Sequence, residues 1–219
     1  MMKHILLVLI SLVWVPLSFS HQSCGKIEYG SKKAPIEIIE YASPTCTVCA
    51  EFTKITFPKI HKKYIQSGKV RLTVINLPYN AIDLKACVLA QKSPNPRKFN
   101  KLIYTHQEKW LFAKDPMKKL LALMIENGMS PQKAKEALND QHTENLLISQ
   151  RLSEEKKQDI DLIPIFIVGQ KKILGLMPWN ELQEVIEKAL KHVKKGNSLK
   201  TFGQKQCQKQ KISKKPTRN

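Results

Sequence analysis

A chain of 219 residues is long enough for one domain with a substantial core, or for such a domain with an insertion. Its formal net charge of +19 is concentrated at the carboxyl end, where ten basic residues and no acidic residue follow position 190. We expect residues 196–219 to be a basic disordered tail, which is either simply solvated or makes weak contact with anionic lipid headgroups. Phe202 is the lone aromatic residue of this tail, which, together with an export signal, disfavours nucleic-acid binding.

The amino terminus has the features of a secretory signal peptide. Lys3 and His4 precede an apolar run over residues 5–15, and Ser18 and Ser20 supply small residues before a cleavage site. We predict a signal peptide at residues 1–20 that is cut before His21, with an uncleaved anchor as the alternative. Export would place the rest of the chain where disulfides persist.

The elements that follow are predicted in the order β–α–β, several helices, and β–β–α. Residues 21–34 form a polar lead-in, and residues 35–41 and 69–77 form two strands. Because the two strands are joined by one helix, they should be parallel. That helix starts at Cys46, and Pro58 should kink or divide it. The other elements are helices at 81–91, 97–110, 116–127, from 131 and at 143–157, strands at 163–168 and 173–175, and a last helix at 178–193.

The motif Cys46-Thr47-Val48-Cys49 lies at the junction of the first strand and this helix. Two cysteines three residues apart on a first helical turn are close enough to form a disulfide. Cys46 would face unpaired backbone N–H groups and the positive end of the helix dipole, which favour its thiolate. Cys49, one turn deeper, should be shielded. The expected chemistry is thiol–disulfide exchange, in which Cys46 attacks and Cys49 acts second.

Other interpretations of the motif remain open. A zinc site would need a second pair of ligands, and neither another C-x-x-C nor a paired-histidine motif follows. A purely structural disulfide would close too short a loop to constrain the unfolded chain much. A copper-handling protein would use the soft thiolates, but it lacks methionine or histidine companions near the motif. We therefore predict no metal and no cofactor.

Several segments resemble the DsbA-like branch of the thioredoxin superfamily, most of all its alphaproteobacterial members. The resemblance covers about residues 30–191. It is carried by the segments at Glu40–Cys49 and Thr56–Ile60, by the helical stretch with its Leu138-Asn139-Asp140, and by Ile163–Gly169. The resemblance implies an α/β thioredoxin fold with a helical insertion between its βαβ and ββα halves. Residues 35–79 and 162–195 would form the thioredoxin domain, and residues 80–161 the inserted domain.

The resemblance also implies roles for individual residues. Cys46 would be the attacking, substrate-linked thiol and Cys49 the resolving thiol. Pro164 matches a proline that follows a cis peptide bond and faces the disulfide, and Ile163 would leave its backbone groups to an extended substrate. Glu40 matches an acidic residue beneath the site, where it would be a buried carboxylate with a raised pKa that relays a proton from Cys49. The alternative for Glu40 is an exposed acid at the end of a strand.

Two features depart from the family pattern. Strongly oxidising members often have Pro-His between the cysteines, whereas Thr47 and Val48 supply neither the ring nor the charge. We therefore expect a reduction potential toward about −180 mV rather than about −120 mV. Relatives often pair a cysteine of the first insertion helix with a second one, but Ala137 occupies that second position. Cys87 should then be a buried thiol that behaves as a small apolar side chain, and Cys24 and Cys207 could pair.

The sequence thus predicts a periplasmic enzyme, a monomer that oxidises unfolded exported proteins by exchange at its cysteine pair. A membrane oxidase of the DsbB type would reoxidise it. The alternative is a disulfide isomerase or reductase that a membrane partner keeps reduced. Isomerases of the DsbC type carry an amino-terminal dimerisation domain, for which the predicted lead-in leaves no room.

Overall fold

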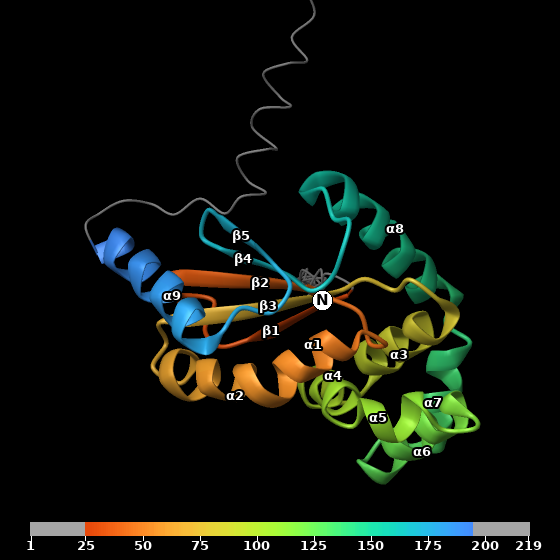
Figure 1. Ribbon diagram of the computed structural model, residues 1–219. Coiled ribbons are helices and arrows are strands. Elements are labelled where there is room, and N and C mark those ends of the chain that lie inside the picture. The colour runs from red at the N-terminus through yellow and green to blue at the C-terminus, as the bar shows by residue number, and fades with distance from the viewer. Residues whose placement is uncertain (1–24, 195–219) are drawn as a thin grey trace, which may run out of the picture.

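The computed structural model describes residues 25–194 (Figure 1). The predicted signal peptide, the basic tail, Cys24 and Cys207 all lie outside the described residues. Between residues 25 and 194, no helix combines the length and the apolar composition that a bilayer crossing needs.

A five-stranded mixed sheet forms the centre of the described fold. Its strands are β1 (Lys26–Tyr29), β2 (Ile36–Ala42), β3 (Val70–Asn76), β4 (Ile165–Val168) and β5 (Lys171–Leu174), in the spatial order β1-β3-β2-β4-β5. β2 and β3 are parallel, as the βαβ prediction requires, and the other neighbouring pairs are antiparallel. The strand that leads into the cysteine motif is therefore the central one, paired on both sides.

The predicted order of elements is wrong at residues 21–34, where it has no strand but the structure has β1. β1 pairs antiparallel with β3, and among its four residues only Ile27 is buried. A strand this short, with one buried side chain, has no hydrophobic alternation to detect, so its conformation is decided by the edge of β3. β4 also begins two residues later than predicted, at Ile165.

One long helical run follows the cysteine motif. It comprises α1 (Thr47–Glu51), the π-helical segment η1 (Phe52–Thr56), α2 (Phe57–Ile60) and a second π-helical segment η2 (His61–Ile65). Pro58 has no N–H to donate, and just before it the N–H of Phe57 donates to the C=O of Phe52, five residues back. The run is thus divided into α and π segments around Pro58, while the junction residues keep right-handed helical backbone angles.

The predicted helical insertion is present. Its helices are α3 (Ala81–Lys92), α4 (Pro96–Thr105), α5 (Gln107–Leu111), α6 (Pro116–Glu126), α7 (Pro131–Leu138) and α8 (Gln141–Gln158). Most begin at a side chain that accepts a backbone N–H, as at Asn80, Asp115 and Ser130. The helix predicted at 97–110 is instead two helices, because the backbone of His106 leaves the helical region between α4 and α5.

The buried side chains of the described residues form separate clusters. The main cluster lies between the sheet, the α1–η2 run and α9 (Trp179–Lys194), and it includes Cys49. A second cluster lies within the insertion, around Trp110, and contains Cys87 as the expected buried thiol. In Figure 1 the insertion helices gather beside the start of α1, whereas α2 and α9 lie along the sheet. The insertion is therefore placed against the cysteine motif.

Candidate functional site

The cysteine motif begins where β2 ends. A turn over residues 43–45 leads to Cys46, which is the N-cap residue of α1. Cys46 and Cys49 form a disulfide, with their Cα atoms 5.2 Å apart. The Sγ of Cys46 also accepts a hydrogen bond from the N–H of Cys49 at 3.1 Å. The sulfur of Cys46 thus takes the place of a capping oxygen at the positive end of the helix.

The two cysteines differ in their exposure. Cys46 is half-buried, whereas Cys49 is completely buried in the main cluster. Thr47 and Val48 between them are both exposed, and Val48 keeps 40% of its surface accessible. Of the two cysteines, only Cys46 therefore leaves part of its surface open to a partner molecule, together with the Thr47-Val48 dipeptide.

Glu40 lies on β2, two residues before the strand ends, and is only 2% exposed. Its Oε1 has no hydrogen-bond partner among the described residues. Burial raises the pKa of this carboxyl well above its usual range, because the charged form would lose its hydration without a compensating partner. Glu40 is thus a buried carboxyl and not an exposed acid at the end of a strand, and its role in proton transfer stays a prediction.

Sequence reasoning missed a buried polar chain between the sheet and the insertion. Asn76, the last residue of β3, donates from Nδ2 to Oδ1 of Asn100 at 2.7 Å. The hydroxyl of Tyr104 donates to Oδ1 of the same Asn76 at 2.8 Å. Burial is the main cause that raises the pKa of Tyr104. The asparagine at the end of an apolar strand is the sequence signal that could have indicated this contact.

The peptide bond between Ile163 and Pro164 is cis, as the resemblance implies. Pro164 is buried, and its C=O accepts the N–H of Gly175 at 2.8 Å. Ile163 is half-buried and packs against the main cluster, as Cys46 does. Within residues 25–194, neither backbone group of Ile163 has a hydrogen-bond partner. Binding of an extended substrate at Ile163 stays a prediction.

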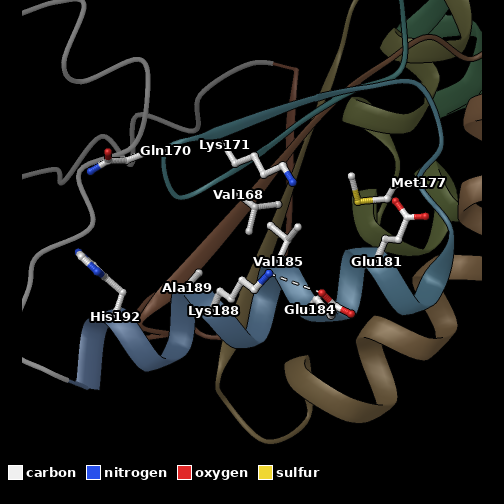
Figure 2. Close-up of a pocket in the computed structure, with 10 residues that line it drawn as sticks. All are labelled: Val168, Gln170, Lys171, Met177, Glu181, Glu184, Val185, Lys188, Ala189 and His192. Carbon is white, nitrogen blue, oxygen red and sulfur yellow. Dashed lines mark ion pairs between the residues drawn. The ribbon is translucent and has the colours of Figure 1, made fainter.

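A cavity of about 420 Å³ lies elsewhere, between α9 and the β4–β5 hairpin (Figure 2). Its floor includes Val168 and Val185, and its rim carries charged side chains such as Lys188, which pairs with Glu184 at 3.5 Å. None of the residues assigned to the cysteine site lines it. Among the described residues, no group of three or more His, Cys, Asp or Glu side chains is arranged to hold a metal ion.

Comparisons with known proteins agree with this geometry. A family model described as thioredoxin matches residues 22–188. A protein of Rickettsia conorii named putative protein-disulfide oxidoreductase is 29% identical over 75% of this chain and 60% of its own length. Disulfide bond formation protein D of Bacillus subtilis is 27% identical over 76% of this chain and 78% of its own length. The chain thus spans about three fifths of the rickettsial relative.

Solved structures extend the likeness to three dimensions. The crystal structure of Wolbachia pipientis alpha-DsbA1 matches with a TM-score of 0.72 and 25% identity, over 78% of this chain and 94% of that one. Oxidised BdbD from Bacillus subtilis matches with a TM-score of 0.62 and 26% identity, over 76% and 94% of the two chains. The chain belongs to the thioredoxin family, and within that family it is a DsbA-like protein.

Proposed function

We propose that this protein is a thiol:disulfide oxidoreductase that introduces disulfides into other proteins by exchange at Cys46 and Cys49. The observation that carries the proposal is the contrast between the two sulfurs. Cys46 is accessible and capped by a backbone N–H, whereas Cys49 is buried. The names of the rickettsial and Bacillus relatives support the same class of reaction.

The proposed reaction has two exchange steps. A substrate thiolate attacks the accessible Sγ of Cys46, which forms a mixed disulfide and releases Cys49 as a thiolate. A second substrate thiolate then attacks the substrate sulfur of the mixed disulfide. This forms the substrate disulfide and releases Cys46 as a thiolate. The substrate loses two electrons, and the enzyme ends as a dithiol. The thiolate of Cys46 leaves readily because its charge faces the N–H of Cys49 and the start of α1.

Glu40 would transfer a proton to and from the buried Cys49. The thiolate of Cys49 forms in an apolar cluster, where a charge is costly. Glu40 is buried on the strand that leads to the motif, and burial raises the pKa of its carboxyl, which favours the protonated form. It can therefore supply the proton that Cys49 takes up, and take it back when the disulfide re-forms.

Substrate would bind beside the disulfide along Ile163 and Pro164. The backbone N–H and C=O of Ile163 are available to pair with an extended segment, which is the way in which peptides add to an exposed edge. Unfolded exported proteins would offer such segments. We further propose a periplasmic monomer that is reoxidised by a membrane oxidase of the DsbB type.

The direction of the reaction is tested by the redox state of the cysteine pair in cells. For an oxidase, trapping the thiols with an alkylating reagent in intact cells should find Cys46 and Cys49 mainly as the disulfide. The purified protein should also oxidise a reduced test protein faster than it reshuffles a scrambled one. A pair that is mainly reduced would reassign the protein as an isomerase or reductase. Copper or zinc retained stoichiometrically, with poor oxidase activity, would indicate a metal-handling protein.

The Thr47-Val48 dipeptide should moderate the oxidising power. Changing Thr47→Pro together with Val48→His places an imidazole beside the sulfur of Cys46, which stabilises its thiolate and hence the reduced form. We expect the reduction potential to rise by about 30 mV or more, equivalent to about tenfold in the equilibrium with glutathione. Equilibration with glutathione buffers measures it. An unchanged potential would show that the dipeptide does not set the oxidising power.

A further inference from the structure

Gln107, the first residue of α5, reaches from the insertion to the turn before the cysteine motif. Its side chain is buried, with 1% exposure. The Nε2 group donates to the C=O of Pro44 at 2.7 Å and to the C=O of Cys46 at 2.9 Å. Both protons of the amide are therefore used on the backbone on either side of Thr45.

Asp83, on the first turn of α3, holds the residue in between. Its carboxylate is completely buried, and Oδ1 accepts the N–H of Thr45 at 2.8 Å. Oδ2 accepts the N–H of Tyr79 at 3.1 Å and a side-chain N–H of Asn80 at 3.1 Å. The backbone from residue 44 to residue 46 is thus fastened by two buried side chains of the inserted helices.

These bonds bear on the sulfur of Cys46 through its own backbone. The C=O of Cys46 that Gln107 contacts also accepts the N–H of Ala50 at 3.1 Å, in the first turn of α1. The Sγ of the same residue accepts the N–H of Cys49. The orientation of the N-cap residue relative to α1 decides whether its sulfur meets this N–H. Gln107 fixes that orientation from outside the helix.

We propose that Gln107, supported by Asp83, is a positioning residue for thiol–disulfide exchange, which keeps the sulfur of Cys46 aligned with the start of α1. The proposal rests on the function proposed above. The inserted helices thereby take part in setting the reactivity of a cysteine that belongs to the thioredoxin part of the chain. Loss of the amide leaves the C=O of Pro44 without this donor and lets the turn relax, so that the thiolate of Cys46 loses part of its stabilisation.

The test compares Gln107→Met, which keeps the length of the side chain but removes both donors, with Gln158→Met as a matched control. Gln158 is also a buried glutamine of the insertion, at 4% exposure, and makes no hydrogen bond to residues 44–46. The pKa of the Cys46 thiol is measured from the ultraviolet absorbance of its thiolate, and the equilibrium of the disulfide with glutathione is measured beside it. Neither readout requires a protein substrate.

For Gln107→Met we expect a raised pKa of the Cys46 thiol and a fall of about tenfold in the equilibrium constant for reduction by glutathione, since a less stable thiolate disfavours the reduced form. The control should match the wild type in both. The proposal is overturned if Gln107→Met lowers only the stability of the fold, or if the control shifts the two readouts equally. If these shifts are found but the wild-type protein does not oxidise a reduced test protein, the proposed function is overturned and the positioning role of Gln107 is not.

Two further measurements apply if Gln107→Met does not fold. Gln107→Asn keeps an amide on a side chain one methylene shorter, which cannot reach both carbonyls, and should shift both readouts in the same direction. Hydrogen exchange of the Cys49 amide in the reduced wild-type protein needs no variant. Protection of this amide is expected. Exchange as fast as that of an exposed amide would show that the sulfur is not held there, which would overturn the proposal.

Discussion

Replacing Cys46 with serine should abolish oxidation of a reduced test protein, because the accessible sulfur that forms the mixed disulfide is lost. Replacing Cys49 with serine should have a different result. The remaining Cys46 thiolate can still attack a disulfide of an oxidised substrate, but no second enzyme thiol is present to displace the substrate by re-forming the Cys46–Cys49 disulfide. Mixed disulfides should then accumulate, and non-reducing electrophoresis should show them as slower bands that a thiol reagent removes.

Cys87 offers the matched control for these two variants. It is buried in the insertion cluster, separate from the cluster that contains Cys49. Cys87→Ala should therefore keep the oxidation activity of the wild type. The order of attack has its own test in the reduced wild-type protein, where alkylation by iodoacetamide should modify Cys46 much faster than Cys49. Equal rates would contradict the assignment of Cys46 as the attacking thiol.

Replacing Glu40 with glutamine should remove a pH dependence of the stability. Burial raises the pKa of Glu40 in the folded protein, whereas the unfolded chain has the ordinary carboxyl pKa near about 4.3. Between these two values the folded protein holds a proton that the unfolded chain has released. The free energy of unfolding should therefore fall as the pH rises, by about 1.4 kcal/mol per pH unit from this group. Below the unfolded value the contribution is constant.

Urea denaturation over a series of pH values measures this effect as the difference between the wild type and Glu40→Gln. The free energy of unfolding of Glu40→Gln should rise relative to that of the wild type as the pH rises above about 4.3. Glu37→Gln is the matched control, because Glu37 lies on the same strand but is only half-buried and pairs with Arg71 at 2.9 Å. It should keep the wild-type dependence on pH that Glu40 causes. Parallel curves for the wild type and Glu40→Gln would show that Glu40 titrates as an ordinary carboxyl.

The same variant separates the effect of Glu40 on stability from its role in proton transfer. Glutamine cannot donate the carboxyl proton, so re-formation and opening of the disulfide should become slower in Glu40→Gln even where the variant is the more stable protein. A rate of exchange with glutathione equal to that of the wild type across the pH series would leave Glu40 a buried acid without a role in the reaction.

Local features of the sequence predicted much of the secondary structure of this protein and the position of its cysteine motif. The cysteine spacing and its place between an apolar strand and an amphipathic helix predicted the motif at the start of α1, where the structure has it. Capping side chains such as Asp115 and Ser130, each followed by a proline, marked the helix starts of the insertion. These signals were readable because they act over a few residues, through side chains that bond the backbone beside them.

Other features were decided only by the tertiary structure. β1 is a strand because β3 offers it an edge, and the isolation of the Glu40 carboxyl depends on the elements that cover β2. Gln107 and Asp83 lie more than thirty residues from the turn that they fasten, and nothing in the residues around them marks that contact. Such bonds depend on how the insertion packs beside α1. The pattern of residues along the chain could therefore locate the cysteine pair, whereas only the folded arrangement shows which distant side chains bond the turn before it.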